Sequence, residues 1–239
     1  MAGTNGPEHD FPEFNSTETK NYLVCSSPRT GSTYLCRLLQ QTGKMGFPSE
    51  YFNQGVHVQE WFQRFSVNSV RELVPILKRF RTSPNGVFGF KAHMDQFQFL
   101  RQQVLVQEAF PELKFILIQR RDLLQQAISL SKAQQTNAWS SLRTPDKQAA
   151  FDIKHIESCM DNIQSQVSGW KKLFAFFDVD YIDVWYEDLC EKPQKTITQC
   201  LEFLGEDEVE IDPGKVDVSV QRDSETQAWI DAIHKQLKY

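Results

Sequence analysis

Four short apolar runs, separated by longer stretches of helical character, constrain this chain of 239 residues more than any other feature. The runs occupy residues 22–25, 87–90, 114–119 and 181–186, and their length and composition are typical of buried strands. Strands that alternate with helices form a mostly parallel sheet with helices on both faces. The sequence therefore predicts an α/β protein with three layers, α/β/α, in which ligands bind at the carboxyl ends of the strands.

The longest helical pattern covers residues 156–177. Its apolar residues recur at intervals of three and four, which predicts one long amphipathic helix. Shorter helices are expected after the first loop, before residue 110, from residue 123 and at 193–204. The polar segment 1–20 predicts a flexible N-terminal leader, which precedes a single domain at 21–239.

Composition and charge exclude several classes of protein. The net charge is −5, whereas a nucleic-acid-binding surface needs a basic stripe. The polar N-terminus does not resemble a signal peptide, and no apolar run approaches the roughly 20 residues that cross a membrane. The five cysteines are irregularly spaced and form no C-x-x-C pair, which favours free thiols over a metal site. These features predict a cytoplasmic protein.

The turn that follows the first expected strand, residues 26–33, consists of small and polar residues around one arginine. A loop between a strand and a helix N-terminus presents backbone N–H groups and the positive end of the helix dipole to an anion. Gly31 allows close approach of the backbone, and Arg29 offers a forked cation that suits phosphate or sulfate oxygens. The nucleotide triphosphatase signature G-x-x-x-x-G-K-[ST] is absent. The alternative is an ordinary helix cap made by Ser27 or Thr30.

A second basic cluster, Arg120-Arg121-Asp122, follows the third expected strand. An arginine that leaves a strand end can point back over the first loop. Ser129 lies eight residues after Arg121, which is about two helical turns, so its hydroxyl and an arginine can hold a second anion together. The alternative is an Arg–Asp pair on the surface, which contributes little to stability.

These two elements together resemble sulfotransferases that use 3′-phosphoadenosine 5′-phosphosulfate (PAPS). Residues 27–33 are similar to their 5′-phosphosulfate loop, and residues 121–129 are similar to their 3′-phosphate element. Within the superfamily, the chain resembles bacterial carbohydrate sulfotransferases of the trehalose 2-sulfotransferase type, whose Gly-x-Pro-x-Glu-aromatic-Phe segment is matched at 46–52. Segments 133–139 and 221–229 resemble further parts of that family. The resemblance implies the P-loop NTPase-like sulfotransferase fold.

The resemblance also assigns roles to the residues that match the cofactor motifs. The 5′-phosphosulfate would be held by the first loop, through Arg29, Thr30, Gly31, Ser32 and Thr33. The 3′-phosphate would be held by Arg121 and Ser129, with Arg120 as a competitor because some relatives place the arginine one position earlier. Arg222 would lie on the cofactor side. The implied co-substrate is PAPS, without a metal.

Glu50 matches the catalytic base of the family, which takes the proton of the acceptor hydroxyl. Arg29 would stabilise the charge that develops on the leaving group. His93 is an alternative base, because eukaryotic cytosolic sulfotransferases carry a Lys-x-His at a similar strand end and use that His. We expect Glu50 to be the base, with Lys91, His93 and Trp139 on the acceptor side.

The expected function is transfer of a sulfuryl group from PAPS to a hydroxyl of a carbohydrate, a glycolipid or another small-molecule acceptor. Two alternatives stay open: a phosphoryl-transfer enzyme with an unusual phosphate loop, and a nucleotide-binding protein without catalysis. The missing Lys-Ser/Thr pair counts against the first, and the presence of Arg29 together with Glu50 counts against the second. The acceptor is set by variable loops. The oligomeric state stays open, and a homodimer is the alternative to a monomer that soluble proteins adopt most often.

Overall fold

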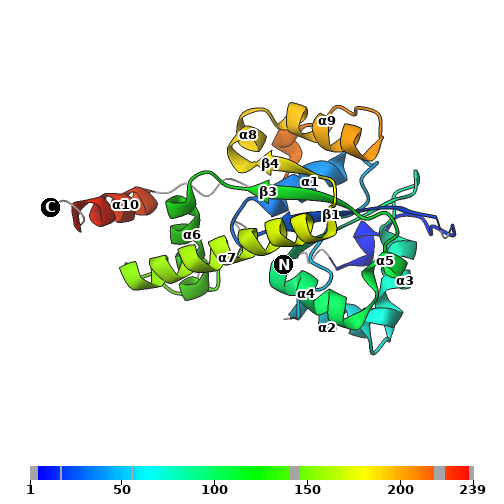
Figure 1. The fold of residues 1–239 in the computed structure, drawn as a ribbon, viewed down its shortest axis with the longest axis horizontal. Helices are drawn as coiled ribbons and strands as arrows, with labels where there is room; N and C mark the ends of the chain where they lie inside the picture. Colours follow the sequence, from blue (N-terminus) through cyan, green and yellow to red (C-terminus); the bar gives the residue numbers. More distant parts are fainter. Residues whose placement is uncertain (1–4, 17, 55, 140–145, 218–223, 237–239) are drawn as a thin grey trace.

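The structure is a computed structural model, and it describes residues 5–16, 18–54, 56–139, 146–217 and 224–236. Its centre is a four-stranded sheet with helices on both faces (Figure 1). The three-layer α/β fold that the sequence predicts is therefore confirmed.

The sheet is parallel throughout, and each strand coincides with one of the four apolar runs. In chain order the strands are β1 (Lys20–Ser26), β2 (Val87–His93), β3 (Lys114–Gln119) and β4 (Tyr181–Trp185). Their order in the sheet is β2-β1-β3-β4, so β1 lies between the two strands that follow it in the sequence. The carboxyl ends of the strands therefore meet at one edge, where the loops after β1, β2 and β3 lie together.

Ten α-helices connect or follow these strands in the described part of the chain. They are α1 (Ser32–Gln41), α2 (Val56–Phe65), α3 (Val70–Arg81), α4 (Met94–Gln103), α5 (Val106–Ala109), α6 (Leu123–Thr136), α7 (Ile153–Phe177), α8 (Tyr186–Glu191), α9 (Pro193–Leu204) and α10 (Ser224–Gln236). Helix α7 has 25 residues, which confirms the single long helix expected there. Two short 3-10 helices, η1 (Pro7–His9) and η2 (Pro213–Lys215), complete the secondary structure.

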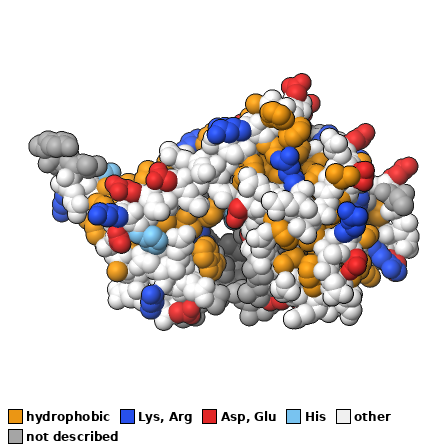
Figure 2. Space-filling model, turned by 60° about the horizontal axis from the view of Figure 1, so that its bottom comes forward, with side chains coloured by type: hydrophobic (Ala, Val, Ile, Leu, Met, Phe, Trp, Pro, Cys, Tyr) orange, Lys and Arg blue, Asp and Glu red, His pale blue; other side chains and the backbone are white. Residues whose placement is uncertain are grey.

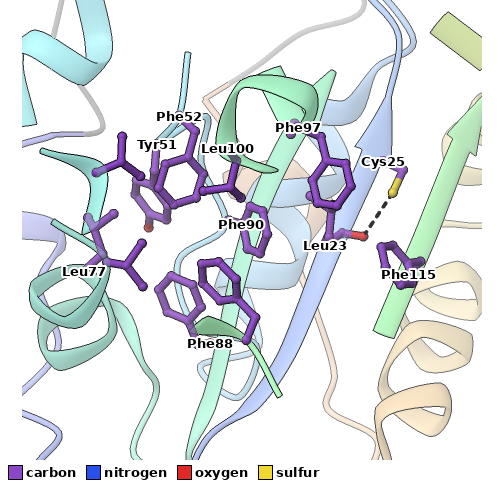
Figure 3. Close-up of a cluster of buried hydrophobic side chains, with 14 of the residues drawn as sticks. Leu23, Cys25, Tyr51, Phe52, Leu77, Phe88, Phe90, Phe97, Leu100 and Phe115 are labelled. Atoms are coloured by element: carbon purple, nitrogen blue, oxygen red, sulfur yellow. Dashed lines mark hydrogen bonds between the residues drawn. The ribbon is translucent and has the colours of Figure 1, made fainter. Parts of the chain in front are cut away.

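Alternate residues of β1 face two different hydrophobic cores. Leu23 and Cys25 point into a core rich in phenylalanine, which also takes in residues of β2, α3, α4 and α7 (Figure 3). Tyr22 and Val24 point into the opposite core, which α1 and α9 cover. Because helices cover both faces at β1, β2 and β3, the central residues of these strands are buried on both sides, as is usual for a parallel sheet.

A third hydrophobic cluster joins α6, α7 and α10 on the side to which the strands point (Figure 1). In the space-filling view α6, α10 and the first part of α7 form the left part of the molecule (Figure 2), while the second half of α7 packs against the sheet through Trp170 and Phe174. Basic and acidic side chains are interspersed on this face. None of the described helices combines the length and the apolar character needed to cross a membrane.

The segment before β1, for which the sequence predicts flexibility, contacts the domain along its described part. Backbone amides of Phe11 and Phe14 donate hydrogen bonds to carbonyls of α3, at 2.9 and 2.8 Å. Arg81 of α3 is fully buried, and its Nε lies 3.0 Å from Oδ1 of Asp10. A buried guanidinium requires a counter-charge, and a carboxylate from the N-terminal segment provides it. This contact cannot be predicted from the polar composition of the segment.

Candidate active site

The loop between β1 and α1 forms a tight turn around two residues with positive φ. Arg29 has φ 63° and Gly31 has φ 85°. A Cβ atom on Gly31 would lie 2.3 Å from the ring of Tyr186, so glycine is required by the backbone and by the contact. Gly31 is also the N-cap of α1, and the hydroxyl of Thr30 donates to the Ser27 carbonyl instead of capping the helix. The interpretation of Ser27 or Thr30 as a cap is therefore wrong, and no side chain caps the N-terminus of α1.

A glutamine of α6 fixes this loop from the other side. Nε2 of Gln126 donates to the Ser27 hydroxyl at 3.1 Å and to the Pro28 carbonyl at 2.6 Å, and the side chain is buried. The role of Gln126 cannot be predicted from the sequence, because a glutamine within a helix carries no distinguishing pattern. Its contacts set the distance between the first loop and α6.

Arg29 connects the two elements for which the sequence predicts anion sites. Its Nε donates to Oγ of Ser129 at 3.0 Å, and its guanidinium also donates to the Trp139 carbonyl. Burial lowers the pKa of Arg29, and the nearby charge of Arg120 lowers it further. Two cations that are held close together at low exposure favour an anion between them.

The structure distinguishes the two adjacent arginines after β3. Arg120 stacks on the ring of Tyr186, 4.7 Å from its centroid, beside the turn at Gly31. Its guanidinium donates to Oε1 of Gln125, while its buried Nε has no hydrogen-bond partner among the described residues. Arg120 therefore lies next to Arg29 with a hydrogen-bond donor still to be satisfied.

Arg121 lies on the opposite side of this strand end. Its guanidinium forms a bidentate pair with Asp188 at 2.8 and 2.7 Å, and half of the side chain is exposed. Asp122, the neighbour considered as its surface partner, instead caps α6 by accepting from the Gln125 amide. Of the two arginines, the structure thus brings Arg120 toward the first loop.

Glu50 lies in the loop between α1 and α2, and polar contacts hold both of its carboxylate oxygens. Oε1 is 2.7 Å from Nζ of Lys91, and Oε2 accepts from Asn53 at 2.9 Å and from Gln96 at 3.0 Å. Gly46 starts this loop with φ 60°, where a Cβ would lie 2.8 Å from the Val87 carbonyl oxygen. The glycine of the 46–52 motif therefore lets the loop pack against β2, which places Glu50 beside Lys91.

The charge state of Glu50 results from opposing effects. Burial raises the pKa of a carboxyl group, but the charge of Lys91, with hydrogen bonds from Lys91 and Gln96, outweighs burial. The pKa of Glu50 is consequently held well below its ordinary value, and the group is a carboxylate.

His93 ends β2 and shares this site with Glu50. Its Nδ1 lies 2.9 Å from Oγ of Ser26, and its backbone amide donates to Oε1 of Gln96 at 3.0 Å. Burial lowers the pKa of His93, although the Glu50 carboxylate opposes that effect, so the ring is neutral near pH 7. Gln96 thus joins both candidate bases, and the only sign of it in the sequence is its place three residues after His93, as in a capping box.

The other residues expected in the site differ in their distance from the first loop and in their exposure. Nζ of Lys91 donates to Oγ1 of Thr33 at 3.1 Å, so it also touches the first loop. Trp139 is about half exposed, and its ring N–H donates to Oδ1 of Asn137. Arg222 lies outside the described residues. Within the described ranges, the structure contains no cluster of three or more His, Cys, Asp or Glu side chains suited to a metal.

Comparison with known proteins identifies relatives over nearly the whole chain. A trehalose 2-sulfotransferase of Mycobacterium tuberculosis is 28% identical over 255 residues, which cover 90% of this chain and 95% of the relative. A second trehalose 2-sulfotransferase, from Mycolicibacterium smegmatis, is 28% identical over 251 residues, which cover 88% and 92%. Both relatives match most of this chain and most of their own length.

A solved structure and a family profile agree with these relatives. The crystal structure of a sulfotransferase from Alicyclobacillus acidocaldarius has a TM-score of 0.51 and 14% identity, and it covers 92% of this chain and 93% of its own. This likeness confirms the sulfotransferase fold alone. The sequence profile of the Stf0 sulphotransferase family matches residues 21–236. The chain therefore belongs to the Stf0 sulfotransferase family.

Proposed function

We propose that this protein transfers a sulfuryl group from PAPS to a hydroxyl of trehalose or a similar small carbohydrate. The names of the two relatives support the acceptor class, since both are trehalose 2-sulfotransferases. The observation that carries the proposal is the convergence of Arg29, Arg120 and Ser129 beside the N-terminus of α1. Two anions on one small molecule, such as the 5′-phosphosulfate and 3′-phosphate of PAPS, match two adjacent cationic sites.

The donor is assigned to the loop and to the end of β3. Amides of the Gly31 turn and the Thr33 hydroxyl are suited to the 5′-phosphosulfate. Arg120, with its unsatisfied Nε, and Ser129 are suited to the 3′-phosphate. We therefore prefer Arg120 to Arg121 for this role, because Arg121 is already neutralised by Asp188.

The chemistry is an in-line displacement at sulfur. PAPS supplies the sulfuryl group, whose bond to the phosphate oxygen breaks as a bond to the acceptor oxygen forms. Glu50 takes the proton of the acceptor hydroxyl, which requires a carboxylate, and Glu50 is one. Arg29 and the loop amides stabilise the negative charge that develops on the departing phosphate. Gln96 and Asn53 fix the orientation of the Glu50 carboxylate.

The proposal is tested by incubating the purified protein with PAPS and a panel of sugars, with trehalose first, and by detecting sulfated product by mass spectrometry. We expect sulfated trehalose or a sulfated relative of it. Glu50→Gln is expected to lower kcat by about 10²- to 10⁴-fold, the usual contribution of a general base. His93→Asn serves as the comparison, because it removes the other candidate base from the same site.

Two results would contradict the proposal. Stabilisation by ATP with Mg²⁺, in the absence of stabilisation by adenosine 3′,5′-bisphosphate, would favour phosphoryl transfer. Full turnover by Glu50→Gln together with loss of turnover in His93→Asn would transfer the role of base to His93.

A further inference from the structure

Lys91 is a lysine inside the sheet, and its side chain is only 7% exposed. It belongs to β2, where it pairs in register with Val24 of β1. Its neighbours Phe90 and Ala92 point into the phenylalanine-rich core, so Lys91 points to the opposite face, toward α1. A buried ammonium is unfavourable unless it is paired, and its partners therefore indicate what it does.

The two partners of Lys91 belong to opposite sides of the proposed reaction. Nζ is 2.7 Å from Oε1 of Glu50, the proposed base, and it donates at 3.1 Å to Oγ1 of Thr33 in the donor loop. One ammonium group thus contacts both the base and the donor site. Lysine carries three donors on a flexible stem, so Nζ can shift between these partners without movement of the backbone.

An anion bound beside Thr33 would compete with Glu50 for this ammonium. In the structure the Lys91 ammonium is paired with the Glu50 carboxylate. Burial raises the pKa of Glu50, but Lys91 is the strongest of the effects that keep this pKa low. A carboxylate that is paired in this way accepts a proton weakly. A shift of Nζ toward the donor would make Glu50 a stronger base.

We infer that Lys91 is a positioning residue that binds Glu50 in the free enzyme and turns to the phosphosulfate when the donor occupies the loop. The base is then released only when a sulfuryl group is present for transfer. This inference rests on the proposed function, and it changes the expected place of Lys91 from the acceptor side to the boundary between donor and base.

The test is a double-mutant cycle on donor binding, measured by calorimetry with PAPS alone, without acceptor. If Glu50 and the donor compete for Lys91, Glu50→Gln lowers the Kd for PAPS by about tenfold, equivalent to one charge-assisted hydrogen bond of about 1.4 kcal/mol. Lys91→Met raises the Kd, and Glu50→Gln then has no further effect in that background. In a Lys91→Arg background, which keeps the cation, the tightening by Glu50→Gln returns in part.

Each outcome has one meaning. Equal tightening by Glu50→Gln with and without Lys91 shows simple removal of a negative charge, and it overturns the inference while leaving the proposed function intact. A wild-type protein that does not bind PAPS overturns both. If Lys91→Met does not fold, the Kd for PAPS is compared between wild type and Glu50→Gln, and between Lys91→Arg and the double variant Lys91→Arg/Glu50→Gln. If Glu50→Gln leaves the Kd unchanged in both backgrounds, Glu50 and the donor do not compete for Lys91.

Discussion

Arg29 Nε and Ser129 Oγ lie 3.0 Å apart although 100 residues separate them in the sequence. This hydrogen bond joins the loop after β1 to the second turn of α6, which are the two places where the sequence predicts anion sites. The two predicted sites therefore lie side by side, and the residues that surround this bond provide the most direct tests of the proposed function.

The two arginines after β3 give a matched pair of variants. Arg120→Ala is expected to weaken binding of adenosine 3′,5′-bisphosphate by about tenfold or more, the effect of losing a hydrogen bond to a charged group. Arg121→Ala should change that affinity little, because the Arg121 guanidinium is already paired with Asp188 at the surface, whereas Arg120 lies against Tyr186 beside the first loop. Calorimetry with the bisphosphate and with 5′-AMP measures both. A larger loss in Arg121→Ala would reassign the 3′-phosphate.

Gly31 and Gly43 allow the shape of the donor loop to be tested. Both have positive φ, at 85° and 67°, but a Cβ on Gly31 would meet the Tyr186 ring, whereas a Cβ on Gly43 has nothing within 4 Å. Gly43→Ala should cost about 1 kcal/mol of unfolding free energy through backbone strain alone. Gly31→Ala should cost more and should also abolish stabilisation by the bisphosphate. Urea unfolding with and without ligand measures this, and equal effects of the two changes would argue against a tight contact at Tyr186.

The low pKa of Glu50 has a consequence for stability at acid pH. A carboxyl group whose pKa is lower in the folded protein stabilises it above the unfolded value, about 4.3, and this contribution is lost as the pH falls further. Wild type should therefore lose stability below that pH more steeply than Glu50→Gln, by at least about 1.4 kcal/mol, which corresponds to one pKa unit. The measurement is the unfolding free energy between pH 3 and pH 7. Glu202→Gln, on the exposed face of α9, is the control and should follow wild type.

Asp10 tests whether the N-terminal segment is part of the folded domain. Asp10→Ala removes the carboxylate beside the fully buried Arg81 and should cost about 3 kcal/mol, as expected for an unpaired buried charge. Glu13→Ala removes a partner of Arg79 from a pair that is largely exposed, and it should cost less than about 1 kcal/mol. Thermal unfolding distinguishes them. Similar small losses would show that the segment contributes little.

The sheet and most helices follow from the sequence because their signals are local. A short apolar run such as 114–119 predicts a buried strand. The spacing of apolar residues within 156–177 predicts which face of α7 is buried. The position of the loop 26–33 also follows from local sequence, because its small residues stand between a strand and a helix, a pattern that suits an anion.

The features that could not be predicted depend on the direction in which a side chain points and on partners that are distant in the sequence. Successive residues at a strand end point to opposite sides, so Arg120 and Arg121 differ only through what lies around them, Tyr186 for one and Asp188 for the other. Gln96 and Gln126 have no local pattern and gain their roles from contacts between elements. The N-terminal segment looks mobile until its partner, the buried Arg81, is known.

Arg29 donates a hydrogen bond to the main-chain carbonyl of Trp139. A substitution at position 139 therefore replaces the indole, with its hydrogen bond to Asn137, but leaves in place the carbonyl that accepts from Arg29. Variation of the side chain and retention of the Arg29 contact are thus compatible at this one position.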